Sequence, residues 1–297
     1  MNNEMSHRGN RWIGIVLVLL GASSYGLLSP FVKMAYSSGY DEIRVSVVQV
    51  TMGTLLAWLL AAARPKDWVN PLKEPWWQLS MVGIFGLVLT TFFYNATLNR
   101  MDASLAIILL FQFTWMTIIL DAVVGKRRPS GPQLLSVAIV FIGTLLAVGL
   151  NISVLRQLDL LGTMLGLVSG FTYSLFLYFT GRIQTKMPTA QKSAFMVTAA
   201  VPILYILYPP QHIFQEDVGG LLLWGILLGL IGQLLPTLFF NAGIPRVGGT
   251  LASMLASVEL PVAMIAAYLI LGETVGAFQW LGMALILAGI VLAERKS

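Results

Sequence analysis

The sequence predicts an all-α membrane protein of ten transmembrane helices, arranged as two inverted five-helix repeats with both termini in the cytoplasm. Three observations predict this fold. Hydrophobic residues make up 57% of the chain and charged residues only 10%, against about 25% charge in a soluble domain. The apolar residues form ten blocks, and the mean hydropathy is +0.80. The two halves of the chain also resemble each other at a fixed offset.

Each of the ten blocks is long enough to cross a bilayer, which takes about 20 apolar residues at a rise of about 1.5 Å. The first block follows a basic start but is too long for the hydrophobic region of a cleaved signal peptide, so we expect it to remain as a span. The connections are short, so function must lie among the helices. In chain order the expected spans are residues 12–36, 43–63, 77–98, 103–124, 134–150, 160–181, 194–208, 221–242, 250–271 and 278–293.

The distribution of basic residues predicts the orientation, because Lys and Arg are retained in cytoplasmic loops. With the N-terminus inside, only four of the 18 basic residues fall on the outer side, and they are Lys33, Arg44, Arg100 and Arg156. An odd number of spans would destroy this alternation. The pattern also explains the net charge of +5 without a nucleic-acid partner.

An internal repeat relates the two halves at an offset of 146 residues, where YNATLNRMDASLA (94–106) aligns with FNAGIPRVGGTLA (240–252). Five spans per repeat is an odd number, so the second copy must be inverted in the membrane. We expect the first repeat over 1–151 and the second over 152–297. The matched pairs include Tyr25 with Tyr173 (shifted by two further residues), Asn95 with Asn241, Arg100 with Arg246, Gln133 with Gln279, and Gly143 with Gly289.

Two segments carry a resemblance to a known family: GASSYGLLSPF (21–31) and SVELPVAMIAAYLILGETVGAFQWLGMALILAGIVLA (257–293). Together with the two five-helix repeats, they resemble the drug/metabolite transporter (DMT) superfamily, specifically its EamA branch. The most specific piece is the turn formed by Glu259 and Pro261, followed by LGE at 271–273. The resemblance covers nearly the whole chain.

The first repeat departs from that pattern. It has GKR at 125–127 where LGE is expected, and Trp115 stands where the second repeat has Pro261. A role for these first-repeat positions is therefore not carried over. The resemblance implies an exporter of amino acids and other small metabolites, with a central cavity between the repeats.

Glu259 is the one deep carboxylate of the predicted spans, because Asp121 lies near a span end. A central charge costs about 2.5 to 3.5 kcal/mol on insertion scales, so Glu259 must face the bundle interior, be paired or be protonated. It could carry protons or bind a substrate amine. The alternative is a neutral Glu that holds helices together by hydrogen bonds.

Prolines inside the spans predict helix breaks. Pro261 cannot donate the helical hydrogen bond and so frees the carbonyl of Ser257 beside the Glu259 carboxylate. Simple kinks without a ligand are the alternative. The expected helix-break residues are Pro30, Pro236 and Pro261.

Deep polar and aromatic residues complete the predicted substrate site. Gln112 and Trp115 are three residues apart and share a helix face, while Tyr25 and Tyr173 are repeat mates. Such rings suit a pocket that holds an organic molecule by its flat faces, although helix packing is an alternative role for each. The predicted substrate-binding residues are Tyr25, Gln112, Trp115, Tyr173, Gln233 and Glu259.

Several chemistries are excluded by the residues available. The chain has no cysteine and two histidines, His7 and His212, both in predicted polar segments. No metal site, catalytic triad or ATP-binding loop can be assembled, so we expect no cofactor, no catalytic residues and a gradient as the energy source.

We interpret the chain as a secondary transporter of the cytoplasmic membrane that exports an amino acid or similar metabolite. Its expected partners are a small-molecule substrate and the lipid bilayer, with proton coupling left open. A membrane-embedded enzyme and a structural or sensory membrane protein remain alternatives.

Overall fold

The computed structural model describes residues 2–98, 100, 103–126, 128–148, 159–209 and 218–295. Within these residues the chain is helical, with turns and short connections but no strand. In the part of the chain that the structure describes, nine helical segments are long and apolar enough to cross a membrane. A further apolar helix, α7 (Gly131–Ala147), is shorter at 17 residues. The protein is therefore a multi-pass membrane protein.

The helices follow the predicted spans closely in both halves. The first half contains α1 (Asn2–Ser37), α2 (Glu42–Ala62), α3 (Trp76–Gly83), the π-helix η3 (Ile84–Leu89), α4 (Thr90–Leu98), α5 (Ala103–Leu110), α6 (Phe113–Val123) and α7. The second half contains α9 (Leu160–Thr180), α10 (Thr189–Thr198), α11 (Ala200–Leu207), α12 (Val218–Gly229), the π-helix η5 (Leu230–Leu234), α13 (Leu235–Val247), α14 (Gly249–Ala256), α15 (Glu259–Leu271) and α16 (Ala277–Arg295).

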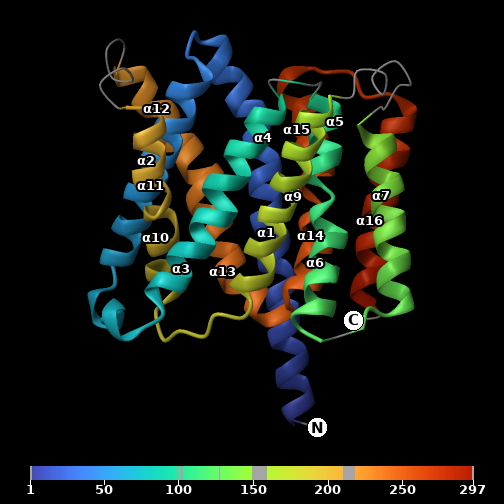
Figure 1. The fold of residues 1–297 in the computed structure, drawn as a ribbon, viewed down its shortest axis with the longest axis horizontal. Helices are drawn as coiled ribbons and strands as arrows, with labels where there is room; N and C mark the ends of the chain where they lie inside the picture. Colours follow the sequence, from blue (N-terminus) through green and yellow to red (C-terminus); the bar gives the residue numbers. More distant parts are fainter. Residues whose placement is uncertain are drawn as a thin grey trace.

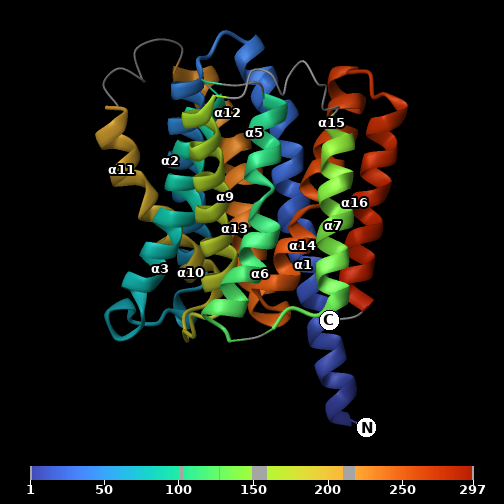
Figure 2. The same ribbon diagram turned by 45° about the vertical axis from the view of Figure 1, so that its right-hand side comes forward.

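The bundle has two ends, which we call the terminal face and the far face. Helix α1 begins and α16 ends at the same end of the bundle, the terminal face (Figure 1). Helix α7 lies beside α16 along its length in both views (Figures 1 and 2). That placement supports the prediction of ten spans. The expected repeat boundary at residue 151 lies outside the described residues.

Interruptions recur at matched positions in the two halves. The π-helices η3 and η5 begin 146 residues apart, at Ile84 and Leu230. The breaks between α5 and α6 and between α14 and α15 are separated by the same offset, since the second segments begin at Phe113 and Glu259. These matched interruptions support the proposal that the chain consists of two copies of one five-helix unit.

Helix pairing and polar cross-links follow the same symmetry. Helix α1 packs against α13, and α9 packs against α4. At the far face Arg100 forms an ion pair with Asp159 at 3.2 Å. At the terminal face its repeat mate Arg246 donates from Nε to Asn10 Oδ1 at 3.0 Å. Each arginine therefore ties the end of one helix to the N-terminal part of the helix packed against it.

Asp159 also begins α9, because its carboxylate accepts the backbone N–H of Gly162 at 2.9 Å. This hydrogen bond, together with the Arg100 guanidinium, holds the pKa of Asp159 below its ordinary value. A carboxylate that accepts backbone N–H groups at a helix N-terminus is stabilised in its charged form. The start of α9 is thus stabilised by a local hydrogen bond to Gly162 and by Arg100 of the first half.

The connection between α2 and α3 docks on the connection between α9 and α10. Glu74 accepts from Thr185 Oγ1 and from the backbone N–H of Lys186, both at 2.8 Å. The Gln191 side chain bonds to the backbone N–H and carbonyl of Val69, at 3.2 and 2.7 Å. These contacts join the two halves at the terminal face. The backbone hydrogen bond lowers the pKa of Glu74 most strongly.

Candidate functional site

Glu259 is the first residue of α15 and lies near the middle of the span Gly249–Leu271. The helix is interrupted immediately before it, at Ser257 and Val258, where backbone bonds tighten to the i→i−3 pattern. Pro261 cannot offer an N–H to the Ser257 carbonyl, which instead accepts from Leu260 at 3.4 Å. Sequence and local geometry therefore agree on the break beside the carboxylate.

Three tyrosines from three other helices lie within electrostatic range of the Glu259 carboxylate. Tyr25 of α1, Tyr94 of α4 and Tyr173 of α9 each interact electrostatically with it. Tyr173 also interacts with Tyr25. Because the partners come from different helices of both halves, the carboxylate faces the bundle interior rather than lipid.

The site is enclosed but still partly accessible. Glu259, Tyr25 and Tyr94 are half-buried, whereas Tyr173 is only 7% exposed. Within the described part of the chain, no hydrogen-bond partner is found for the Tyr173 hydroxyl. A buried hydroxyl without a partner carries a desolvation cost that a bound polar group or a water would remove. The cluster therefore offers an acceptor carboxylate and a free hydroxyl to a small polar molecule.

Aromatic packing holds the tyrosine rings in place. Tyr25 lies against Phe240 with ring centroids 6.0 Å apart, and Tyr173 packs edge-on against Phe113 at 4.8 Å. Phe113 stands in the first repeat where Glu259 stands in the second, since each begins the helix after the break. Both tyrosines thus pack against a phenylalanine and interact with Glu259, while the first repeat has an apolar ring where the second has the carboxylate.

Glycines allow the broken helices to approach their neighbours closely. A Cβ on Gly26 of α1 would lie 2.6 Å from the Glu259 carbonyl oxygen, and a Cβ on Gly170 of α9 would lie 2.8 Å from the Leu110 carbonyl oxygen. Real Cβ atoms do not approach other atoms so closely, so neither site admits a larger residue without movement. Each break is therefore packed against a glycine of the other repeat.

Gln112 and Trp115 interact with each other rather than with the carboxylate cluster. Gln112 Oε1 accepts from the Trp115 indole N–H at 2.7 Å, and Gln112 Nε2 donates to the Ile108 carbonyl at 2.7 Å. Trp115 is 38% exposed. The predicted shared face is therefore found, while a place for these two residues beside Glu259 stays a prediction.

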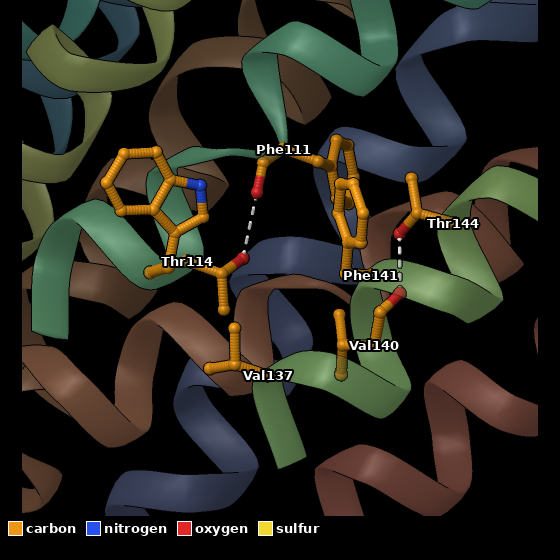
Figure 3. Close-up of a pocket in the computed structure, with 7 residues that line it drawn as sticks. Phe111, Thr114, Val137, Val140, Phe141 and Thr144 are labelled. Atoms are coloured by element: carbon orange, nitrogen blue, oxygen red, sulfur yellow. Dashed lines mark hydrogen bonds between the residues drawn. The ribbon is translucent and has the colours of Figure 1, made fainter. Parts of the chain in front are cut away.

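A shallow hollow lies between α7 and the junction of α5 with α6 (Figure 3). Its lining has two hydroxyls, and both donate to carbonyls of their own helix: Thr114 to Phe111 at 3.0 Å and Thr144 to Val140 at 2.9 Å. The helices that carry Tyr25, Tyr94 and Tyr173 do not contribute to it. The residues that line the hollow are Phe111, Thr114, Trp115, Val137, Val140, Phe141 and Thr144.

Gln233 lies in the π-helix η5 and faces α2. A Cβ on Gly53 of α2 would lie 2.4 Å from Gln233 Cβ, and Gln233 is 4% exposed. Its Nε2 has no hydrogen-bond partner among the described residues. The structure therefore places Gln233 at the contact of α2 with the second half, and its predicted role in substrate binding stays a prediction.

The three prolines differ in their effect on the helices. Pro261 follows the α14–α15 break, and Pro236 follows the π-helix η5. Pro30 lies inside α1, which is one helix from Asn2 to Ser37, so the expected break at Pro30 is wrong. A membrane helix tolerates proline because packing against neighbouring helices maintains the helical path despite one missing hydrogen bond.

Tyr94 is a member of the cluster that the sequence did not single out. It precedes the repeated Asn-Ala pair, and its repeat mate is Phe240. A tyrosine in one copy opposite a phenylalanine in the other is a weak signal for a polar site. Among the described residues, no group of His, Cys, Asp and Glu could hold a metal ion.

Comparisons with known proteins agree with this architecture. The model of the EamA-like transporter family matches residues 12–149 and 160–294. A solved crystal structure superposes with a TM-score of 0.71 over 96% of this chain and 97% of its own, at 18% identity, which shows the fold alone.

Curated relatives of the chain are uncharacterized transporters. The chain is 23% identical to the uncharacterized transporter YcbK of Bacillus subtilis, over 91% of this chain and 88% of that protein. It is 26% identical to an uncharacterized transporter of Archaeoglobus fulgidus, over 95% and 97%. It is 24% identical to the uncharacterized inner membrane transporter YicL of Salmonella typhimurium, over 73% and 72%.

Proposed function

The chain belongs to the EamA-like transporter family, and from that premise we propose that it is a secondary active transporter that exports an amino acid or similar small metabolite. Transport proceeds across the cytoplasmic membrane by alternating access to a site at Glu259. The single observation that carries this proposal is a carboxylate at mid-span that interacts electrostatically with tyrosines of three other helices.

The chemistry of the cluster favours a substrate with a protonated amine. The carboxylate supplies the charge partner, and the tyrosine hydroxyls supply hydrogen bonds that fix orientation. Aromatic faces at Tyr25 and Tyr173 suit the apolar part of an organic molecule. The same carboxylate can carry a proton when no substrate is bound, which would couple export to a proton gradient.

The matched helix breaks support alternating access. Helices broken at mid-depth are typical of transporters built from inverted repeats, because the broken ends present polar backbone to the substrate. Here the breaks precede Phe113 and Glu259, and a glycine of the opposite repeat packs against each of them. Exchange of conformation between the two copies would expose the site first to one face and then to the other.

Counterflow in proteoliposomes tests the proposal. A pool of labelled amino acids is offered to vesicles that hold the same compounds unlabelled. We expect uptake with the native chain and a loss of about 10- to 100-fold for Glu259→Gln, as for removal of a charge-assisted hydrogen bond. Asp67→Asn, which neutralises an exposed acid in a connection, is the matched control.

Two results would contradict the assignment. Absence of counterflow for every amino acid and amine in the pool would remove the proposed substrate class. Unchanged uptake by Glu259→Gln across a series of pH values would remove the role of the carboxylate, whatever the substrate.

A further inference from the structure

Three ion pairs link the two halves among the described residues, and the pair of Arg100 with Asp159 is one of them. The other two lie at opposite faces of the bundle. Lys33 Nζ lies 2.6 Å from Glu273 Oε1, beyond the C-terminal end of α15 at the far face. Arg182 Nη2 lies 3.0 Å from Asp121 Oδ1, at the C-terminal ends of α9 and α6 at the terminal face. Each pair joins one residue of the first half to one of the second.

These pairs lie on the same helices that form the site. Helix α1 carries Tyr25 and helix α15 begins at Glu259. Nearer to the far face, Lys33 of the same α1 binds Glu273, which follows α15. Helices α9 and α6 carry the matched contact of Tyr173 with Phe113, and their ion pair lies toward the terminal face. The two ion pairs therefore join equivalent pairs of helices under the proposed inverted repeat, although their residues are not repeat mates.

In each helix pair, the two helices are closely packed between their ion pair and the middle of the span. Gly26 of α1 touches the backbone at Glu259, and Gly170 of α9 touches the backbone from Leu109 to Phe113. Beyond these contacts the helix ends are held together by exposed or half-exposed charges. In Lys33 and Glu273 the side chains are 54% and 46% exposed. A contact of this kind can open without disturbing the packed centre.

We propose that these two ion pairs are the gates of the transporter: Lys33 with Glu273 closes access to Glu259 from the far face, and Asp121 with Arg182 closes access from the terminal face. The proposal rests on the proposed transport function and names residues that regulate access to its site. Opening alternates because each pair joins the repeats at a different end of the bundle.

The two gates differ in strength. Asp121 is 20% exposed and also accepts from Thr250 Oγ1 at 3.1 Å. The Arg182 guanidinium lies 4.3 Å from the centre of the Tyr178 ring. The far-face gate has Pro30 between Gly26 and Lys33 in α1, where one helical hydrogen bond is missing. We therefore expect the far-face gate to open more easily.

Cysteine accessibility tests the gates directly, because the chain has no cysteine of its own. Ala263→Cys, one turn beyond Glu259 and partly accessible, provides a single reactive thiol. A membrane-impermeant maleimide is applied to right-side-out and inverted vesicles. Breaking the far-face pair with Lys33→Gln or Glu273→Gln should raise labelling from that face roughly two- to fivefold, as for an exposed ion pair. Asp121→Asn should raise labelling from the terminal face by at least as much.

Control variants distinguish the opening of a gate from a general destabilisation of the helix bundle. Asp159→Asn removes the Arg100 ion pair at the far face, away from the contact of α1 with α15. Because Asn can still cap α9, this variant should leave labelling from the far face unchanged. The charge-reversed pair K33E/E273K should return labelling to the starting level. If Lys33→Gln does not accumulate in the membrane, Glu273→Gln breaks the same contact.

The outcomes distinguish the gates from the transport function. The gating proposal is contradicted if labelling is unchanged in all gate variants, or if it rises from the same face in all of them. Either result counts against the gates even if counterflow succeeds. Opposite labelling shifts at the two faces support the gates even if no tested amino acid is transported, because labelling needs no substrate.

Discussion

At the scale of single residues, Glu259 combines a mid-span carboxylate with neighbours from both halves of the chain. Its position follows from the sequence, because a charge so deep must face the bundle interior. Its neighbours do not follow from the sequence in the same way. Tyr25 and Tyr173 are repeat mates and could be paired in advance, whereas Tyr94 joins the cluster only because α4 packs against α9.

Replacing Tyr94 with phenylalanine tests this unpredicted member of the site. The change keeps the ring but removes a hydroxyl that interacts with Glu259. We expect the KM for transport to rise roughly 2- to 10-fold, as for one lost hydrogen bond, with little change in expression. Tyr268→Phe, at a 48% exposed tyrosine that packs against Trp280, is the control. A KM equal to that of the control would exclude Tyr94 from the site.

At the scale of helices, the α5–α6 break shows how a span is interrupted without proline. The Gln112 side chain donates to the Ile108 carbonyl and accepts from the Trp115 indole N–H. Thr114 donates to the Phe111 carbonyl. Side chains thus satisfy the backbone in the first repeat at the point where the second repeat has Pro261.

Gln112→Leu should therefore act on stability. It would leave the Ile108 carbonyl and the Trp115 indole N–H without their partners, at a cost of roughly 1–3 kcal/mol. Thermal unfolding of the detergent-solubilised protein measures the effect, with Gln184→Leu in an exposed connection as the control. If transport falls while the unfolding temperature stays unchanged, Gln112 contacts the substrate instead, as its position in the sequence predicts.

The docked connection at the terminal face should respond to pH. The backbone N–H of Lys186 lowers the pKa of Glu74 below its ordinary value of 4.5. The contact therefore contributes stability above that ordinary value and loses it as the pH falls through the lower value in the folded protein. We expect the Lys186 amide, corrected for intrinsic rates, to exchange hydrogen several-fold faster on acidification through this range.

Glu74→Gln provides the control for this pH dependence. Its amide oxygen can still accept a hydrogen bond but does not titrate, so exchange at Lys186 should no longer vary with acidification. Persistence of the pH dependence in Glu74→Gln would assign it to another group.

At the scale of the whole molecule, the predicted inverted repeat requires ten spans with both termini on one side. Single cysteines test this arrangement. Ser38→Cys lies beyond the far-face end of α1, and Lys66→Cys lies in the connection between α2 and α3 at the terminal face. With the termini in the cytoplasm, an impermeant thiol reagent should label Ser38→Cys in intact cells and Lys66→Cys only after permeabilisation. Labelling of both sites from outside would contradict the topology.

The sequence by itself determined the membrane class, the span positions and the repeat. These properties depend on apolar length and on residue identity at a fixed offset, which are local or periodic properties of the chain. The sequence also located Glu259 and the break beside Pro261. The predicted helix break at Pro30 was wrong, because α1 continues as one helix through this residue. Packing of α1 against its neighbours compensates for the single missing hydrogen bond.

Only the tertiary structure decided which residues meet. Tyr94 joined the Glu259 cluster, Gln233 turned toward α2, and Gln112 bonded to Trp115. The physical reason is that a span's apolar pattern sets its depth in the membrane, while the side of the helix that faces a given neighbour depends on close contacts such as those at Gly26 and Gly170. Those contacts bring together residues far apart in the chain, and only the assembled bundle brings Lys33 to Glu273 and Asp121 to Arg182.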